Sequence, residues 1–245
     1  MKRSILLLAL LFSIAAYAQE TRDIIVRNPI GNYVERYRAL ASDTTVKHGT
    51  YRRMAFNGGA PKLLGQYKLG KKDGRWQEFS YWDMFIVGLG NYTEDKRTGI
   101  WTFCSKLNVK EQEYDYDKKQ VVFYAKDAAA KYAVVNGKDT VRNVKLDRPP
   151  LYIGGNVSAL TFFISHMDVP EENIKKPING TVIIAYLIDK NGHNIKTWVK
   201  KGLDKDVDKT VHALAKQLPD TWVAGTLKGK AVNSIYTISI PYSQM

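Results

Sequence analysis

The sequence predicts an α+β protein in which an N-terminal antiparallel sheet of β-hairpin repeats precedes a domain with the element order β-β-α-β. Two observations predict this fold class. An aromatic residue, a charged turn and Gly-x-Trp recur 25 residues apart, ending at Trp76 and Trp101. Beyond Pro150, an apolar run, an amphipathic helical pattern and an alternating run follow one another. The expected divisions are a signal peptide, a lead-in segment, the repeats, a linker that could carry a hairpin, and the C-terminal domain, at residues 1–18, 19–46, 47–124, 125–149 and 150–245.

The first residues have the features of a secretory signal peptide. Lys2 and Arg3 precede an apolar run over residues 5–16, and Ala16-Tyr17-Ala18 forms a small-x-small cleavage site. The apolar run is shorter than the roughly 20 residues that span a bilayer. We therefore expect cleavage after Ala18 and a soluble protein exported to the periplasm. The alternative is an uncleaved N-terminal segment that anchors the chain in the inner membrane.

The formal net charge of the chain is +13, which falls by the two charges of Lys2 and Arg3 to +11 after cleavage. Such a basic chain favours anionic partners, such as an anionic lipid surface or a cell-wall polymer. No nucleic-acid motif occurs, and an exported chain does not meet nucleic acid. Cys104 is the only cysteine, so no internal disulfide is expected and its thiol should be buried and inert.

The repeats explain the aromatic residues of the N-terminal half. Residues 67–69 read as a strand, residues 70–74 as a turn, and residues 75–79 as the returning strand. Gly49-Thr50-Tyr51 keeps the phase of the two Gly-x-Trp motifs, with Tyr in place of Trp. Each hairpin of such an array buries its face on the next one. The aromatic side chains should therefore form a ladder along one face of a continuous sheet.

These residues resemble the MORN-type hairpin repeats of bacterial envelope proteins, with Y-x-x-G-K-K-D-G-x-W from Tyr67 to Trp76 as the best match. The resemblance covers roughly residues 47–124. It implies a surface that binds lipid or protein, although the two tryptophans could instead only pack neighbouring hairpins. Basic side chains gather at the hairpin turns and form either a patch for an anionic surface or a solvated edge: Lys68, Lys71, Lys72, Arg75, Lys96 and Arg97.

The linker and the C-terminal elements follow in order. Asn136-Gly137 predicts a tight hairpin, and Arg148-Pro149-Pro150 marks the domain boundary. The predicted elements after it are a helix, a central strand, a turn, a returning strand, an amphipathic helix capped by Asp206 and ended by Pro219, and a final alternating strand. They occupy residues 158–166, 181–189, 190–192, 195–199, 206–218 and 232–240.

This order of elements, with the residues in it, resembles the TonB C-terminal domain, as it occurs in energy-transducer-like envelope proteins of Gram-negative bacteria. The resemblance covers nearly all of residues 150–245. The matching stretches are P-L-Y-I-G-G-N (150–156), A-L-T-F-F-I (159–164), V-P-E-E-N (169–173), G-T-V-I-I-A-Y-L-I-D-K-N-G (180–192), L-P-D-T-W-V-A-G (218–225) and L-K-G-K-A-V-N-S-I-Y-T-I-S-I-P (227–241).

The TonB resemblance implies a binding mechanism and a class of partner. In that family a short peptide of a receptor adds as a strand to the open edge of a small sheet. The partner would be an outer-membrane receptor of a transport system or another envelope protein. The edge could instead be covered by the repeats or by a second copy in a homodimer. The candidate edge strand comprises Asn233, Ser234, Ile235, Tyr236, Thr237, Ile238, Ser239 and Ile240.

Nothing in the sequence indicates catalysis. No G-x-S-x-G motif, no phosphate loop and no cysteine nucleophile with a partner is found. We therefore expect no enzyme activity, no metal and no cofactor. The four histidines lack the spacing of metal ligands: His48, His166, His193 and His212. Two classes of function remain open, namely a periplasmic binding module of the TonB type and a structural envelope protein whose repeats do the binding.

Overall fold

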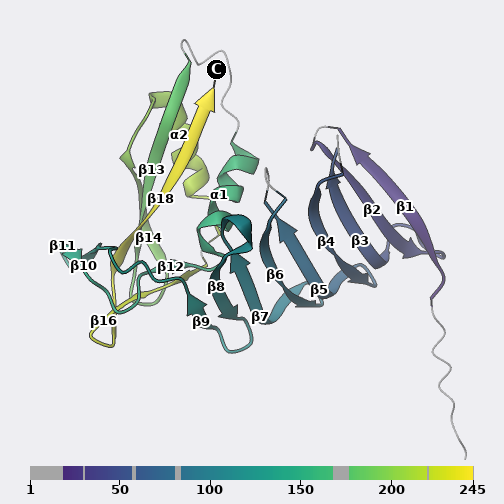
Figure 1. Cartoon of the computed structure of the whole chain (residues 1–245), viewed down its shortest axis with the longest axis horizontal. Helices are drawn as coiled ribbons and strands as arrows, with labels where there is room; N and C mark the ends of the chain where they lie inside the picture. The colour runs from purple at the N-terminus through teal and green to yellow at the C-terminus, as the bar shows by residue number, and fades with distance from the viewer. Residues whose placement is uncertain are drawn as a thin grey trace, which may run out of the picture.

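The computed structural model describes residues 19–29, 31–56, 59–80, 84–167, 177–219 and 221–244 (Figure 1). Within these residues the protein is mostly β, with a nine-strand antiparallel N-terminal sheet, a second antiparallel sheet and two helices. The predicted signal peptide and the V-P-E-E-N stretch at 169–173 lie outside the described residues. No described helix is long and apolar enough to cross a membrane.

The N-terminal sheet contains its strands in chain order, so each strand pairs with the next. It starts at Thr21 rather than at residue 47, because the expected lead-in segment forms the first two strands. The strands are β1 (Thr21–Asn28), β2 (Tyr33–Leu40), β3 (Lys47–Ala55), β4 (Pro61–Lys68), β5 (Lys71–Phe79), β6 (Ile86–Thr93), β7 (Lys96–Cys104), β8 (Lys110–Asp115) and β9 (Gln120–Tyr124).

The hairpin turns are shorter than expected. Strands β4 and β5 are joined by Leu69 and Gly70 alone, and both residues have positive φ, 51° and 82°. Gly74, expected to end the turn, instead lies inside β5 at φ 71°, where the pairing with β4 shifts around Gly65. The prediction of a turn over residues 70–74 is therefore wrong, because the positive φ of Gly74 serves a bulge in the returning strand.

The ladder is present, and each tryptophan lies on a glycine of the preceding strand. Trp76 and Trp101 are fully buried. A Cβ at Gly65 would lie 2.2 Å from the ring of Trp76, and a Cβ at Gly90 would lie 2.4 Å from the ring of Trp101. The indole N–H of Trp76 donates to the carbonyl of Gln66 at 3.1 Å, and that of Trp101 donates to the carbonyl of Asn91 at 2.9 Å. The sequence period thus repeats a ring, the glycine beneath it and its hydrogen bond.

The second sheet has the strand order β11-β10-β18-β13-β14. The hairpin expected on Asn136-Gly137 is present, but it pairs with β18 and so belongs to this sheet. The sheet therefore extends across the boundary expected at Pro149-Pro150. Its strands are β10 (Tyr132–Asn136), β11 (Asp139–Val144), β13 (Ile178–Ile188), β14 (Asn194–Lys201) and β18 (Ser234–Gln244). Two short pairs complete the strands: β12 (Leu151–Tyr152) with β15 (Trp222–Val223), and β16 (Gly225–Leu227) with β17 (Lys230–Val232).

Helices α1 (Gly155–His166) and α2 (Lys205–Ala215) share one hydrophobic core with the second sheet. The amphipathic pattern predicted α2, but its cap is Asp204 rather than Asp206. The side chain of Asp204 accepts the backbone N–H groups of Asp206 and Val207, at 2.9 Å and 3.2 Å. The sheet side of the core comes from alternate residues of β13 and β18, which include Val182, Ile184, Tyr186, Ile188, Ile238 and Ile240.

Two side chains of β8 hold the N-terminal sheet against the start of α1. The buried amide of Gln112 donates to the carbonyl of Tyr152 at 3.1 Å and accepts the N–H of Gly154 at 2.9 Å. Glu111 accepts the N–H of Asn156 at 2.9 Å, in the first turn of the helix, where a negative charge is favoured. Burial raises the pKa of Glu111, and its backbone hydrogen bonds partly oppose this rise. The two sheets are thus joined by a specific polar contact.

Candidate functional site

Strand β18 has one edge that is open over most of its length. On one side it pairs with β13 from Ser234 to Gln244 without a register shift. On the other side β10 pairs with it only at Ser234. Beyond that residue, no strand in the described part of the chain pairs with this edge. The bounds of the strand differ from the predicted ones: Asn233 lies outside β18, and the strand continues past Ile240 to Gln244. At its start, the hairpin β10–β11 covers Ser234.

The backbone groups of alternate β18 residues point to the open edge. The carbonyl of Asn233 accepts the N–H of Val135 in β10, at 2.9 Å. Because N–H and C=O directions alternate along an antiparallel strand, Thr237 and Ser239 point the same way as Asn233, and Ile238 points toward β13. Pro241 falls at an outward position, where its missing N–H costs β13 no bond. Within the described residues, the outward N–H and C=O groups of Thr237 and Ser239 therefore have no partner strand.

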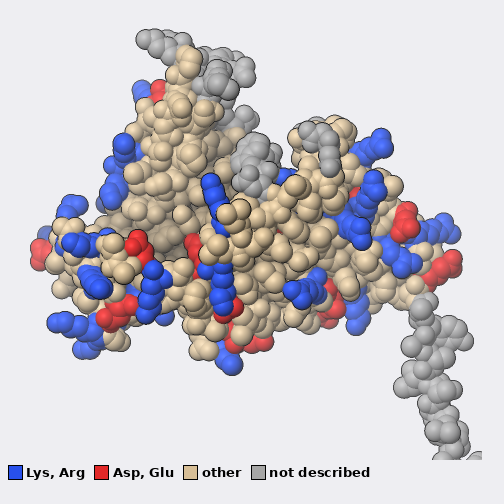
Figure 2. Space-filling view, in the orientation of Figure 1, with Lys and Arg blue, Asp and Glu red and all other residues tan. Residues whose placement is uncertain are grey.

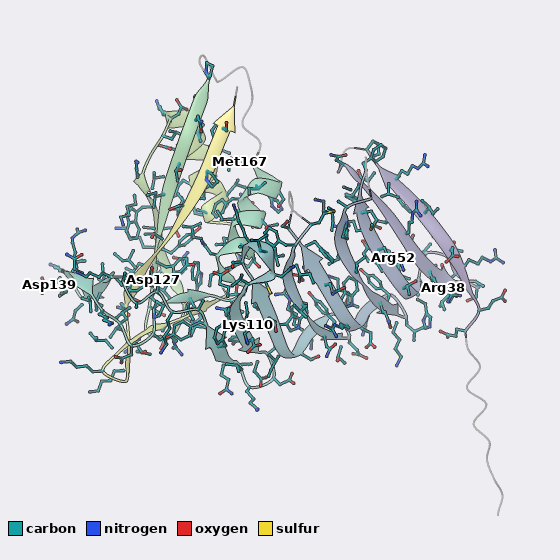
Figure 3. All side chains as sticks on the ribbon, viewed as in Figure 1. Arg38, Arg52, Lys110, Asp127, Asp139 and Met167 are labelled. Carbon is teal, nitrogen blue, oxygen red and sulfur yellow. The ribbon has the colours of Figure 1, made fainter. Side chains whose placement is uncertain are left out.

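A groove of about 1260 Å³ begins where the open edge begins. Its floor is the face of the second sheet that is turned away from the helices, with Leu187, Trp198 and Thr237. Its walls are the segment between β9 and β10 and the hairpin β10–β11, which Asp127 and Asp139 mark in Figure 3. Its basic lining residues are Lys126, Lys131, Arg142, Lys145, Lys196 and Lys200.

The groove carries an excess of positive charge. Three acidic residues also line the groove, and each accepts a backbone N–H: Glu111 from Asn156 at 2.9 Å, Asp127 from Ala129 at 2.9 Å and Asp147 from Gly229 at 2.8 Å. Within the described residues, none of the six basic side chains has an ion-pair partner. Figure 2 shows Lys and Arg gathered over β10, β11 and β14. The groove therefore suits a ligand with negative charges.

The six basic residues expected to form a patch on the hairpin turns do not share one face. Lys68, Lys71, Arg75 and Lys96 are exposed, and Lys71 pairs with Glu94 at 3.4 Å. The other two turn onto the ladder. Lys72 lies 4.6 Å from the ring centre of Trp76 and 4.8 Å from that of Tyr92, and burial lowers its pKa. Arg97 lies 4.3 Å from the ring centre of Trp101 and pairs with Glu78 at 2.7 Å.

A repeated cation is a feature that the sequence pattern did not single out. Lys47, Lys72 and Arg97 stand at the same 25-residue interval as the glycines and tryptophans. Each lies over the ring four residues later and over a second tyrosine, which is Tyr67 in β4, Tyr92 in β6 and Tyr116 directly after β8. Such cation–π contacts stabilise partly desolvated charges. These cations therefore belong to the ladder, and their recurrence at this interval in the sequence was a signal for it.

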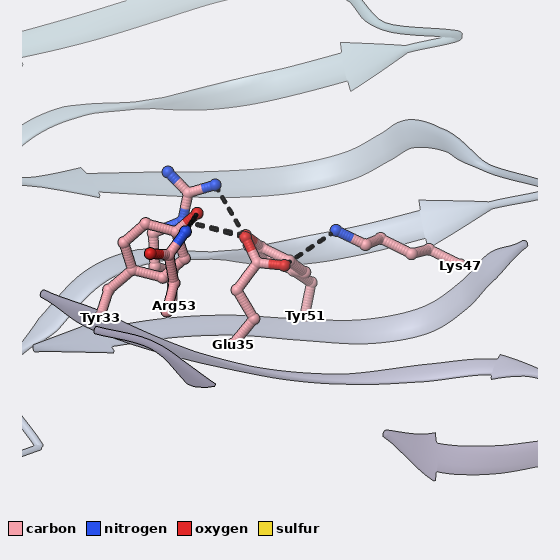
Figure 4. A network of polar contacts seen from close by, with 6 residues as sticks. Tyr33, Glu35, Lys47, Tyr51 and Arg53 are labelled. Carbon is pink, nitrogen blue, oxygen red and sulfur yellow. Dashed lines mark hydrogen bonds and ion pairs between the residues drawn. The ribbon is translucent and has the colours of Figure 1, made fainter. Parts of the chain in front are cut away.

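The first ladder cation belongs to a network around Glu35 (Figure 4). The carboxylate of Glu35 accepts the hydroxyl of Tyr51 at 2.6 Å, and it pairs with Arg53 at 2.8 Å and with Lys47 at 3.2 Å. Burial alone would raise the pKa of Glu35, but these hydrogen bonds together lower it. Burial also raises the pKa of the Tyr51 hydroxyl, so this group stays a donor at neutral pH. The network fixes the first rungs of the ladder and holds no pair of carboxylates for acid–base chemistry.

We expect this network to make stability depend on pH. The depressed pKa means that Glu35 contributes stability above the range near 4.3 where unfolded glutamates titrate, and loses it as the pH falls through its folded pKa. Glu35→Gln should therefore lower the melting temperature at pH 7, and the difference from the wild type should shrink toward pH 3. Melting curves across this range test the prediction. A difference that stays constant from pH 7 to pH 3 would mean that the ionisation of Glu35 does not contribute to stability.

Neither Cys104 nor any of the four histidines lines the basic groove. His48 accepts the N–H of Leu69 at 3.3 Å, and His212 lies 3.1 Å from the carbonyl of Thr197. Cys104 is buried, which raises the pKa of its thiol. In the described parts of the chain, no three His, Cys, Asp or Glu side chains come together as a metal site. The open edge of β18 and the basic groove beside it are therefore the strongest candidates for a site.

Comparison with protein-family models, with curated proteins and with solved structures finds no match to this chain.

Proposed function

We propose that this protein is an exported binding protein of the TonB C-terminal type, with MORN-like repeats before that domain. An extended segment of another envelope protein, such as an outer-membrane transport component, adds as a strand to β18. The observation that carries the proposal is the open edge, where Thr237 and Ser239 direct their N–H and C=O groups away from β13. The order of elements around this edge agrees with the resemblance in the sequence.

The geometry limits how the added strand can pair. Main-chain bonds supply affinity in strand addition, and each contributes about 0.5–1.5 kcal/mol net. β10 blocks the edge at Ser234 and Pro241 offers no donor, so the main contacts fall at Thr237 and Ser239. The end of the added strand that lies near Thr237 reaches the basic groove. A partner with Asp or Glu at that end therefore gains electrostatic complementarity.

The location of the protein is part of the proposal. Residues 1–18 act as a cleaved signal peptide, which delivers the mature chain to the periplasm with Gln19 as its first residue. In that compartment an outer-membrane receptor exposes extended periplasmic segments that can reach β18. Mass spectrometry of the protein from cells would report an intact Met1 if the N-terminal segment were instead an anchor.

Proline substitution tests the proposed edge. The partner is first captured from envelope extract with the wild-type protein, identified and purified. Thr237→Pro and Ser239→Pro each remove an outward donor and add bulk at the edge, so both should keep the wild-type melting temperature, since edge positions tolerate Pro. Each should weaken partner binding by about tenfold or more, the equivalent of one lost bond.

Thr237→Val is the matched control, because it changes the same side chain and keeps the backbone N–H. It should bind like the wild type. Proline variants that fold and still bind the partner normally would exclude strand addition at β18. Early melting of both variants would show that these backbone groups are engaged inside the fold.

A second function is favoured by four exposed basic residues of strands β4, β5 and β7, namely Lys68, Lys71, Arg75 and Lys96. In this alternative the repeats bind anionic lipid or a cell-wall polymer. Co-sedimentation with vesicles that contain phosphatidylglycerol discriminates between the two, because charge reversal at Lys68 and Lys96 would abolish it and Thr237→Pro would not. Point variants are preferable to truncation, since a cut before Pro150 would remove β10 and the Gln112 contact.

A further inference from the structure

The outermost strand of the N-terminal sheet, β1, has a second exposed edge. No strand in the described residues pairs with its free side. Its apolar residues are unusually accessible, with Ile25 60% and Val26 42% exposed. Exposed edges are commonly protected by charged side chains, above all Lys, or by Pro. Three lysines protect the edge strand β14 and Pro241 stands at the open edge of β18, whereas β1 contains neither Lys nor Pro, and its charged residues include both signs.

The backbone direction of β1 follows from one hydrogen bond. The N–H of Ala41 donates to the carbonyl of Glu20 at 2.8 Å, at the position that continues the β1–β2 register. Even-numbered residues of β1 therefore bond to β2, and the odd-numbered residues point their N–H and C=O groups to the free edge. These outward residues are Thr21, Asp23, Ile25 and Arg27.

We infer that β1 is a homodimer interface, in which two copies of the chain pair antiparallel around a twofold axis at Ile25. This register places Asp23 opposite Arg27 of the second copy, and the same contact occurs twice by symmetry. Ile25 faces its own counterpart, and Ile24 faces Val26 on the other side of the sheet. The charges of this edge are therefore complementary to those of the same edge in a second copy of the chain.

Other registers lose this complementarity. Several antiparallel registers bring the outward N–H and C=O groups of one copy opposite those of the other. A twofold axis at Asp23 places two aspartates opposite each other, and a twofold axis at Arg27 places two arginines opposite each other. Centring on Ile24 or Val26 leaves Asp23 without an arginine opposite it. Like charges directly opposite each other destabilise a strand pair, and opposite charges stabilise it. The sequence of β1 therefore selects the register at Ile25.

The charged groups of this edge are free to form the new pairs. The nearest partner of Asp23 within the chain is Arg38, labelled in Figure 3, at 4.0 Å, and the side chain of Asp23 is 90% exposed. An exposed pair at that distance contributes little to the fold. Since Ile24 lies opposite Tyr37 and Val26 opposite Glu35 in β2, the dimer would place the two ladder faces on the same side of one continuous sheet.

Sedimentation equilibrium of the full mature chain tests the proposal. The wild type should dimerise reversibly with concentration. Asp23→Arg and Arg27→Asp should each weaken the dimer at least about tenfold, because each places like charges opposite one another. The double variant should restore the dimer to within about threefold of the wild type. Arg22→Asp is the control for net charge, since the backbone groups of Arg22 bond to β2 and its side chain faces no charged residue of the second copy in this register.

A cross-linking variant tests the register itself. In Ile25→Cys the two cysteines would face each other with Cα atoms about 5.5 Å apart, within the range of a disulfide. Ile24→Cys, one residue away, would face Val26 and should cross-link far less. A wild-type monomer at all concentrations, a dimer unaffected by either single charge reversal, a double variant that stays monomeric, or equal cross-linking of the two cysteine variants would each overturn the inference.

Discussion

Replacing Trp76 with Ala is expected to lower the free energy of unfolding by about 3–5 kcal/mol, the range for buried large aromatics. The side chain is fully buried, lies on Gly65 and contacts Tyr51 and Tyr92, with ring centres 5.7 Å from each. Since Gly65 has no side chain to fill the space, the cavity cannot close by repacking. Chemical denaturation measures the loss.

Trp198→Ala is the matched control, because this tryptophan is only partly buried, on the groove face of the second sheet. It should lose much less stability than Trp76→Ala. An equal loss of free energy of unfolding in the two variants would mean that the aromatic ladder does not determine the stability of the N-terminal sheet. Trp101→Ala should resemble Trp76→Ala, and the two should couple through Tyr92, whose ring lies between them.

Gln112→Leu is expected to have the second largest effect. Leucine nearly keeps the volume of the side chain but removes both hydrogen bonds, which leaves the carbonyl of Tyr152 and the N–H of Gly154 without their partners. A buried polar group that loses its partner costs about 1–3 kcal/mol. We therefore expect a loss of several kcal/mol and faster amide exchange in the first turn of α1.

Gln120→Leu supplies the comparison for this second prediction, because Gln120 is exposed at the start of β9. It should be close to neutral. If Gln112→Leu were equally neutral, the contact between the two sheets would contribute little and each part would fold on its own.

Much of the fold could be predicted from residue patterns that act locally. The 25-residue interval predicted the ladder, since both tryptophans lie in equivalent hairpins. The apolar run at residues 181–189 predicted the central strand β13, and the spacing of Val207, Val211 and Leu214 predicted α2. These patterns predict structure correctly because all the residues that form each pattern lie within a single strand, helix or hairpin.

The remaining features depend on residues that are distant in sequence. The hairpin β10–β11 joins the second sheet by pairing with β18, about a hundred residues later, so its local pattern indicated only a hairpin. Lys72 and Arg97 read as turn charges, but their side chains turn onto rings of the adjacent strands. Gln112 has no local pattern at all, because its partners are backbone groups of another segment.

Strand addition at β18 is tested by residue-resolved amide hydrogen exchange of the isolated protein, at a concentration that keeps it monomeric. We expect the N–H groups of Thr237 and Ser239 to exchange at least about a hundredfold faster than those of Ile238 and Ile240, which bond to β13. A bound partner strand should then slow the first two selectively. Equal, strong protection of all four amides in the free monomer would show that the edge is already covered, and would contradict strand addition at β18.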